Sequence, residues 1–263
     1  MGYYRRYTLF YFLVAFAEAA LWLLLVGTIY QIAVLFLVAA FVVTAVFYTV
    51  LAARRYQRAV SRMVESADTT AFLAENARCI KASSRKTRTA MQLNQVYALM
   101  LEGRFDEATQ LMEQIRPKPR RQKRLRLNNQ LGYAMRSASL ALFTGRMQDA
   151  RAQIEQMQQA LRELAPTDSL FTHYDKAMQD LTQQLAVREG GGKAYVAYFE
   201  NQAKSSGARV TSGSNYFYLG LAQENAGDTA QALVSYDAAV QQIPGLFLGR
   251  QAAERAAQLR AQS

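Results

Sequence analysis

The densest group of charged side chains is the run "RPKPRRQKRLR", residues 116–126, in which seven of eleven positions are Lys or Arg. Such a run can contact nucleic acid, an anionic membrane surface, a protein partner or only water. No Phe, Tyr or Trp lies between residues 106 and 132, so bases would have nothing on which to stack. We therefore favour anionic lipid headgroups, which attract each nearby basic residue by about 1 kcal/mol. The residues expected to make this contact are Arg116, Lys118, Arg120, Arg121, Lys123, Arg124 and Arg126.

The other reactive side chains do not assemble a catalytic or metal site. The chain has one cysteine, Cys79, and one histidine, His173, so neither an internal disulfide nor a Cys/His metal site can form. The sequence "GGGK" at 190–193 does not match a phosphate-binding loop, because Ala194 follows the lysine and no strand precedes it. We expect a protein without cofactor, metal or enzymatic activity.

Positive charge is concentrated in one part of the chain. The formal net charge of +11 comes from 31 basic and 20 acidic residues. Residues 54–126 contribute 17 Lys or Arg and 7 Asp or Glu, whereas residues 127–263 contain 12 of each kind. A basic zone therefore lies between an apolar N-terminus and a neutral C-terminal half.

Two apolar segments near the N-terminus predict a transmembrane hairpin. Residues 8–26 contain one charged residue and residues 29–53 contain none, and about 20 apolar residues suffice to cross a bilayer. Gly27 and Thr28 leave room only for a turn, so the two helices should run antiparallel. The alternative is a secretory signal peptide that ends near "AEAA", but the second long apolar segment favours the hairpin.

The residues that flank these segments predict the orientation. Arg5 and Arg6 precede the first span, and Arg54 and Arg55 follow the second, so both chain ends should be cytoplasmic. A bacterial plasma membrane is the expected location. Glu18 lies near the middle of the first span and faces no polar partner within the hairpin. It is either protonated or turned toward the interface, or it contacts a second copy of the chain in a homo-oligomer.

A repeated pattern predicts the architecture of the remaining chain. "GRFDEATQLMEQI", "GRMQDARAQIEQM" and "GDTAQALVSYDAAV" each begin with Gly, at residues 103, 145 and 227. In each, Ala follows after five residues, a large residue after nine and an apolar residue after twelve. These offsets fall on one face of a helix, so each glycine should introduce an amphipathic helix.

This pattern resembles the tetratricopeptide repeat (TPR), a helix–turn–helix unit of about 34 residues. The copy "YFYLGLAQENAGDTAQALVSYDAAVQQIP" matches best, whereas Val96 and Ala138 replace the small glycine of the first helix in the other copies. A degenerate unit could occupy the gap, with helices near 169–189 and 193–204. The residues expected to pack the repeats are Gly103, Ala108, Gly145, Ala150, Gly220, Gly227, Ala232, Tyr236 and Pro244.

Together these features predict an all-α protein with four parts. A transmembrane hairpin (1–53) is followed by a basic juxtamembrane helical linker (54–85), in which 54–66 extend the second span and another helix begins after Asp68. A TPR-like α-solenoid of about three to four helical hairpins should occupy residues 86–249. Residues 250–263 should form a capping helix with a polar outer face.

The resemblance implies a peptide-binding groove on the concave face, lined by the first helix of each unit. Some family members hold a terminal carboxylate there, but the matching positions are Leu93, Tyr97, Arg136, Ser214 and Tyr218, so that clamp is mostly absent. An apolar or aromatic peptide is the expected ligand. The groove candidates are Leu93, Tyr97, Met100, Met135, Ser139, Leu142, Phe217, Leu221 and Glu224.

The sequence and the resemblance lead to two functional hypotheses. The first is a membrane-anchored scaffold or adaptor that binds a protein or peptide at the cytoplasmic face of the membrane. The alternative is a membrane-tethered RNA- or ribosome-binding protein that uses the basic zone 54–126. A partner captured after nuclease treatment would favour the first hypothesis over the second.

Overall fold

The computed structural model describes residues 3–25, 28–83, 85–115 and 122–262. These ranges contain helices and turns but no strand, which confirms the all-α prediction. The helices of the described part are α1 (Tyr3–Leu25), α2 (Thr28–Ser66), α3 (Thr69–Ala82), α4 (Arg85–Glu102), α5 (Phe105–Ile115), α6 (Lys123–Phe143), α7 (Met147–Leu161), α8 (Ser169–Arg188), α9 (Lys193–Ser205), α10 (Arg209–Asn225), α11 (Thr229–Gln242) and α12 (Phe247–Gln262).

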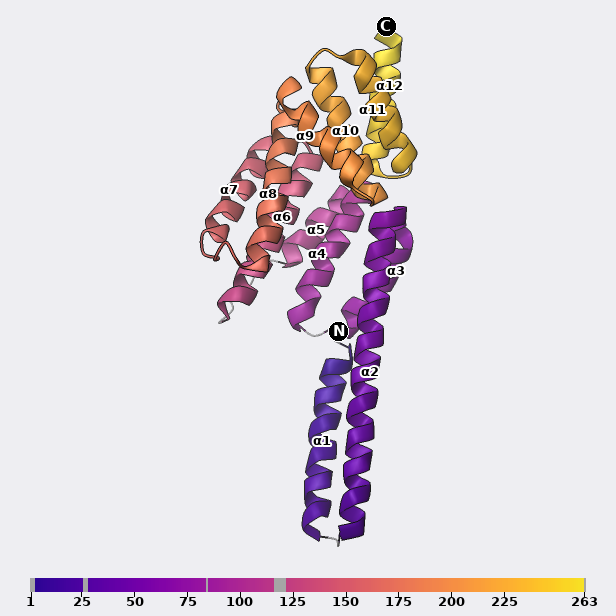
Figure 1. Cartoon of the computed structure of the whole chain (residues 1–263), viewed down its shortest axis with the longest axis vertical. Coiled ribbons are helices and arrows are strands. Elements are labelled where there is room, and N and C mark those ends of the chain that lie inside the picture. Colours follow the sequence, from indigo (N-terminus) through magenta and orange to yellow (C-terminus); the bar gives the residue numbers. More distant parts are fainter. Residues whose placement is uncertain (1–2, 26–27, 84, 116–121, 263) are drawn as a thin grey trace.

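Helix α2 defines the long axis of the molecule. It has 39 residues, which corresponds to about 58 Å. Helix α1 packs along its first part and α3 folds back along its last part (Figure 1). The Asp68 side chain accepts a hydrogen bond from the backbone N–H of Ala71 and thereby caps α3. Both the extension of α2 to Ser66 and the helix that begins after Asp68 are as predicted.

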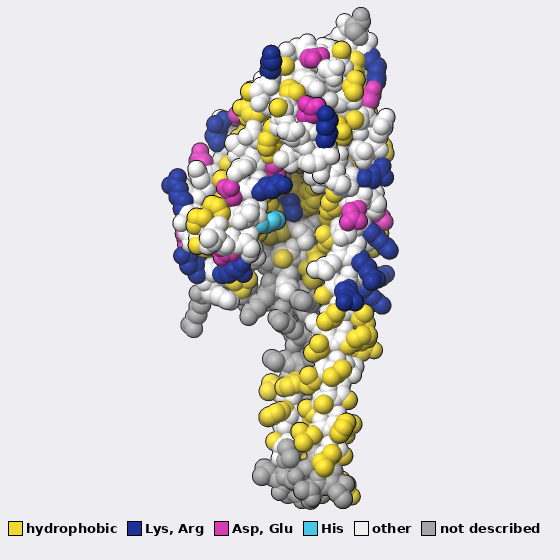
Figure 2. All heavy atoms as spheres, in the orientation of Figure 1, with side chains coloured by type: hydrophobic (Ala, Val, Ile, Leu, Met, Phe, Trp, Pro, Cys, Tyr) yellow, Lys and Arg dark blue, Asp and Glu magenta, His cyan; other side chains and the backbone are white. Residues whose placement is uncertain are grey.

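The end of the molecule formed by α1 and the first part of α2 has an apolar surface. Phe36 is 75% exposed and Leu37 is 70% exposed, although both are large apolar side chains. Figure 2 shows apolar side chains over this end, and Lys and Arg side chains where the apolar surface stops. A continuous apolar surface of this kind indicates contact with a membrane or a partner.

One helix of the described part, Ile32–Ser66, is long and apolar enough to cross a membrane. The apolar stretch Tyr11–Trp22 of α1 is shorter. Of the two predicted spans, 8–26 and 29–53, the structure therefore supports the second alone. Glu18 is exposed on α1 and makes no hydrogen bond or ion pair with another described residue, so its intermolecular contact stays a prediction.

The repeated glycines end one helix and begin the next. Gly103, Gly145 and Gly227 have φ angles of 82°, 75° and 80°, in the left-handed region that favours glycine. Each glycine lies between the two helices of an antiparallel pair: α4 and α5, α6 and α7, or α10 and α11. The alanine five residues later is completely buried in every copy, at Ala108, Ala150 and Ala232.

The third copy shows why its small residues are needed. A Cβ atom on Gly220 of α10 would lie 2.7 Å from two ring carbons of Tyr236 on α11, which is closer than atoms can pack. Tyr236 itself is completely buried. Pro244 lies two residues after the end of α11 and is exposed, so it marks the end of this helix and does not make the packing contact predicted for it.

The stretch between the second and third copies departs from the helix-pair pattern. Helix α8 packs against α6 and α7, whereas α9 packs against α10. The two helices predicted for a degenerate unit both form, but they do not make a tightly packed antiparallel pair like the other three. Helices α4, α6, α8 and α10 are consecutive neighbours in an inner layer, and α5, α7 and α11 lie outside it.

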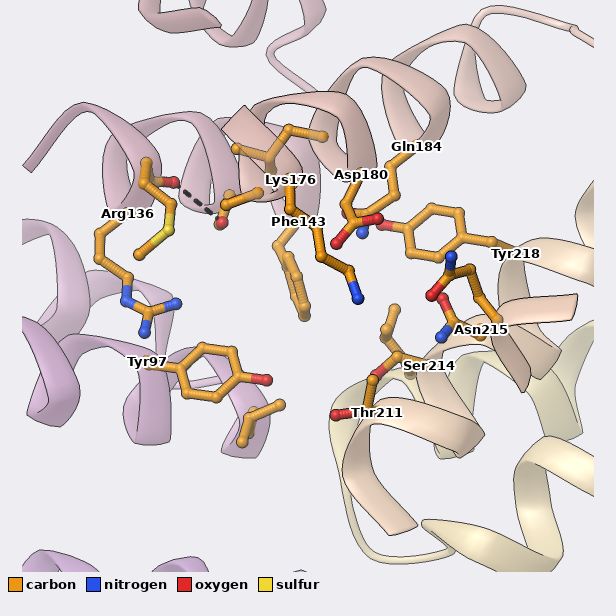
Figure 3. A pocket seen from close by; sticks show the side chains of 17 residues that line it. Tyr97, Arg136, Phe143, Lys176, Asp180, Gln184, Thr211, Ser214, Asn215 and Tyr218 are labelled. Atoms are coloured by element: carbon orange, nitrogen blue, oxygen red, sulfur yellow. Dashed lines mark hydrogen bonds between the residues drawn. The ribbon is translucent and has the colours of Figure 1, made fainter. Parts of the chain in front are cut away.

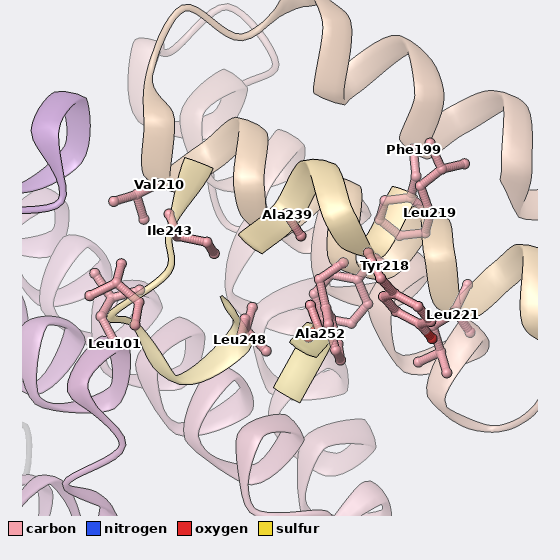
Figure 4. Packing of buried hydrophobic residues seen from close by; sticks show 14 of the residues in the cluster. Leu101, Phe199, Val210, Tyr218, Leu219, Leu221, Ala239, Ile243, Leu248 and Ala252 are labelled. Atoms are coloured by element: carbon pink, nitrogen blue, oxygen red, sulfur yellow. The ribbon is translucent and has the colours of Figure 1, made fainter. Parts of the chain in front are cut away.

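The largest hydrophobic core joins the C-terminal helices to α2 and α3. Its centre is formed by side chains from α9 to α12, including Phe199, Tyr218, Ile243 and Leu248 (Figure 4). Met63 of α2 and Phe72 of α3 belong to the same cluster and are 2% and 1% exposed. Residues 54–66, predicted as part of a linker, thus contribute to the core of the repeat region.

Candidate peptide-binding groove

The inner helices line an open pocket of about 240 Å³ with both polar and apolar side chains. Its walls come from α4, α6, α8 and α10, with one residue each from α9 and α12. The outer helices α5, α7 and α11 contribute no lining residue. This is the arrangement expected of a groove on the concave side of stacked helix pairs. The lining side chains that matter below are Tyr97, Met135, Arg136, Ser139, Phe143, Lys176, Asp180, Ser214, Asn215 and Tyr218 (Figure 3).

One wall of the pocket carries an arginine that lacks a carboxylate partner. The guanidinium of Arg136 lies over the ring of Tyr97, with 4.3 Å between its central carbon and the ring centroid (Figure 3). Its Nε atom is buried and has no hydrogen-bond partner among the described residues. Burial lowers the pKa of Arg136 from its ordinary value, and the nearby Tyr97 and Tyr174 oppose this shift only in part.

The opposite wall, on α8, carries one cation and one anion. Lys176 extends into the space between Phe143 and the polar residues of α10 (Figure 3). It makes no ion pair or hydrogen bond with any described residue. One turn later, Asp180 accepts a hydrogen bond from the hydroxyl of Tyr198, and burial together with this carboxylate raises the pKa of Tyr198. Asp180 therefore has a neutral partner, and the pocket keeps a net positive charge.

Helix α10 supplies hydrogen-bonding groups. Ser214 and Asn215 line the pocket beside Tyr218. The Tyr218 hydroxyl accepts a hydrogen bond from Nε of Arg188 at 3.3 Å, and this arginine lies 5.4 Å from the Tyr218 ring centroid. The Tyr218 ring is held on its other side by Phe199, with 5.5 Å between ring centroids. These contacts fix one face of the pocket before any ligand arrives.

Chemically, this pocket is suited to binding. Two cations, an amide and a hydroxyl can receive a carboxylate and peptide groups, while Tyr97, Phe143 and Met135 offer apolar contact. The Ser139 hydroxyl donates to the backbone carbonyl of Met135 at 2.9 Å, so no base is positioned to activate it. No group of three or more His, Cys, Asp or Glu residues in the described part could hold a metal ion.

The structure divides the nine predicted groove residues into three sets. Tyr97, Met135 and Ser139 line the pocket as predicted. Glu224 lies elsewhere, where it accepts hydrogen bonds from Tyr236 and Arg255. The other five are buried in the cores between helices and do not line the pocket, because neighbouring helix pairs cover them: Leu93, Met100, Leu142, Phe217 and Leu221.

Lys176 and Asn215 were missed by the sequence analysis. Lys176 lies on α8, in the stretch without a clear repeat pattern, so no family position pointed to it. Asn215 directly follows Ser214, one of the positions compared with the carboxylate clamp. Arg136 was also among the compared positions, and it adds to the pocket a cation that the expectation of an apolar or aromatic ligand did not take into account.

The basic run 116–126 is described only from residue 122 onward. Arg124 pairs with Asp168 at 3.0 Å, and Arg126 pairs with Glu163 at 2.8 Å. Lys123 is exposed. The carboxylate of Asp168 also accepts a hydrogen bond from the backbone N–H of Leu170 at the start of α8. Two of the predicted lipid contacts therefore already have partners within the chain, and Arg116, Lys118, Arg120 and Arg121 lie outside the described residues.

Comparison with known proteins adds no assignment. No protein-family model, curated protein or solved structure matches the chain.

Proposed function

We propose that this chain is a membrane-anchored, non-enzymatic scaffold of the TPR type, whose groove binds a peptide segment of a protein partner. The observation that carries the proposal is the pocket lined by the inner helices, in which Arg136 and Lys176 have no carboxylate partner among the described residues. Arg136 is half-buried, and a half-buried cation without a partner is costly, so an acidic ligand would remove that cost, while the exposed Lys176 would add a second charged contact.

The expected ligand is a segment in which an acidic group lies beside an apolar one. Its carboxylate would accept hydrogen bonds from Arg136 and Lys176, which are stronger than bonds between neutral groups. Its apolar part would rest against Phe143 and Met135, which line the same pocket. Asp180 would disfavour a second acidic group nearby, so charge spacing along the segment would contribute to specificity.

The TPR assignment is supported by the three glycine turns and by the buried alanine that follows each of them. The packing of α8 and α9 differs from that pattern, so the proposal is a TPR-like stack with an irregular third unit.

The anchor proposed for this scaffold is a two-span hairpin. Helix α1 has 23 residues, about 34 Å, which is enough to cross a hydrocarbon layer of about 30 Å. It packs along α2, whose apolar part is followed by Arg54, Arg55, Arg58 and Arg62. By the positive-inside rule, the repeat region then faces the cytoplasm.

Site-specific photocrosslinking in native membranes tests the groove. The full-length protein would carry p-benzoylphenylalanine in place of Ser139, which lines the pocket, or in place of Glu155, which is exposed on the outer helix α7. We expect a discrete protein adduct from position 139 and none from position 155. Lys176→Gln should weaken partner binding about tenfold or more, because a hydrogen bond to a charged group is lost.

Lys193→Gln is the matched control, since Lys193 is exposed on α9 and does not line the pocket. It should leave the adduct unchanged. Equal labelling from positions 139 and 155 would contradict the groove assignment. An adduct that disappears after nuclease treatment would instead favour the RNA- or ribosome-binding alternative.

A further inference from the structure

A second cavity, of about 430 Å³, lies between α2 and α3, away from the groove. Three of its lining residues are arginines of α2, and the others come from the same helix or from α3. The residues that line it are Arg55, Arg58, Ala59, Arg62, Ala71, Phe72 and Glu75.

The spacing of the arginines places them on one face of α2. Arg55, Arg58 and Arg62 are separated by three and four residues, the intervals at which helix side chains are neighbours. All three are exposed, and none makes a side-chain hydrogen bond or ion pair with a described residue. Glu75, the acidic residue of the cavity, is 3.5 Å from Arg78, so its charge is shared with a residue outside the lining.

The other wall of the cavity, on α3, is apolar apart from Glu75, and it contains a tightly packed aromatic residue. Phe72 is 1% exposed and packs on Tyr56, with 6.3 Å between ring centroids. Tyr56 is in turn held by Asn94 of α4, whose side-chain amide donates to its hydroxyl at 3.0 Å. A ligand that enters this cavity therefore meets three cations on one side, and Ala71, Phe72 and the carboxylate of Glu75 on the other. Such a combination fits an amphipathic anion better than a free inorganic one.

The cavity also lies at the level of lipid headgroups if α2 spans the membrane as proposed. No charged residue occurs in α2 before Arg54. At a rise of 1.5 Å per residue, Arg55 and Arg58 lie about 3 and 8 Å beyond Ala53. The polar layer on each side of a bilayer is about 5–8 Å thick. The phosphate of a lipid in the adjacent leaflet can therefore reach these guanidinium groups without leaving its layer.

We propose that this cavity binds the phosphodiester headgroup of an anionic phospholipid from the leaflet nearest the repeat region. The inference rests on the membrane placement given under the proposed function, but not on the groove. Arg55 and Arg58 donate hydrogen bonds to the phosphate oxygens, Arg62 adds positive charge further from the bilayer, and the glycerol part lies against the apolar side of the cavity. Zwitterionic phosphatidylcholine binds less well because its quaternary ammonium meets three positive charges.

Arg54 supplies a matched control within the same sequence. It has the same charge as Arg55 and lies next to it along α2, at nearly the same distance from the apolar part of the helix. It does not line the cavity. Each basic residue in contact with an anionic surface contributes about fivefold in affinity. Replacement of Arg58 should therefore weaken lipid retention about fivefold, and replacement of all three about 100-fold. Replacement of Arg54, which acts only through the screened field, should change it less than about twofold.

Native mass spectrometry of the full-length protein tests this proposal. The protein would be released from nanodiscs of phosphatidylcholine and phosphatidylglycerol, and retained lipid would be counted for wild type, R54Q, R58Q and R55Q/R58Q/R62Q. We expect wild type and R54Q to retain phosphatidylglycerol and the two cavity variants to lose it. Equal losses in R54Q and R58Q, or equal retention of both lipids, would overturn the site.

An arm with millimolar inorganic phosphate distinguishes a lipid site from a phosphate site. Displacement of the lipid together with a bare phosphate adduct would refute the lipid assignment. The crosslink from position 139 tests peptide binding in the groove, and lipid retention tests the cavity. Each experiment can therefore contradict its own proposal while the other proposal stands. A chain that does not enter nanodiscs at all would contradict the membrane placement common to both.

Discussion

The two ends of helix α2 differ in what surrounds their apolar side chains. Near the N-terminal end, Phe36 and Val43 are 75% and 67% exposed. Near the C-terminal end, Met63 is 2% exposed and packs with Phe72 and the C-terminal helices. No break separates the two ends, because Thr28–Ser66 is a single helix.

Apolar side chains of this one helix are therefore stabilised in two different ways. Burial against protein stabilises the repeat region in water, whereas the exposed end gains the same hydrophobic free energy only in a non-aqueous medium. Apolar side chains of the same types occur at both ends of α2, whereas its charged residues occur only from Arg54 onward. The two ends of α2 differ in whether other helices cover their apolar side chains. The arginines of α2 lie between these two parts.

Substitutions at the two ends of α2 should have the largest difference in effect. Met63→Ala removes a buried side chain from the core and should lower the free energy of unfolding by about 2–5 kcal/mol. Val43→Ala, on the exposed end, should leave the unfolding of the repeat region unchanged. Thermal melts of the full-length protein in detergent, followed by helical ellipticity, measure both. Equal shifts would contradict the division of α2 into two environments.

Introducing an arginine at an exposed apolar position of α2 and of α11 compares the surroundings of these two helices directly. Leu37→Arg should reduce membrane insertion, at a cost of about 2.5–3.5 kcal/mol for arginine near the centre of a span. Val234→Arg, at a position that is 63% exposed on α11, should change stability by less than about 0.5 kcal/mol. The fraction of protein that resists carbonate extraction measures the first effect, and a thermal melt measures the second. Unchanged insertion of Leu37→Arg would mean that this end of α2 lies in water.

The smallest of the three expected effects concerns packing within the repeat region. Ala232 is completely buried on α11, so Ala232→Leu should destabilise the protein by about 1–3 kcal/mol through overpacking. Ala230→Leu, on the exposed face of the same helix, is the matched control and should be nearly neutral. A melt of Ala232→Leu that matches this control would argue against close helix approach in the third repeat.

Local features of this fold were predictable from the sequence because they depend on local chemistry. Gly103, Gly145 and Gly227 adopt left-handed conformations that most other residues avoid, so their recurrence located three turns. Asp68 located the start of α3 because its side chain can cap the first turn. Such signals act over a few residues and do not depend on the rest of the fold.

The pocket was predictable only in part, because it depends on contacts between helices. Tyr97 and Ser139 line it as the resemblance implied, but Met100 and Leu142 are covered by neighbouring helix pairs. Lys176 enters it because α8 packs beside α6, an arrangement that no repeat position indicated. Which of these residues line the same pocket depends on how the helices stack, and the sequence pattern did not indicate that stacking.

The unbroken course of α2 also determines how the groove can meet its partners. A flexible tether would let the repeat region sample many orientations, whereas a helix that is both the proposed membrane span and part of the core would pass its tilt to the whole repeat region. The distance between the groove and the bilayer would then depend on the depth at which the apolar part of α2 is inserted. The side to which the groove opens would depend on the rotation of α2 about its own axis. In the proposed membrane placement, bilayer thickness would then limit the partners, because only segments presented at that height and in that direction could enter the pocket.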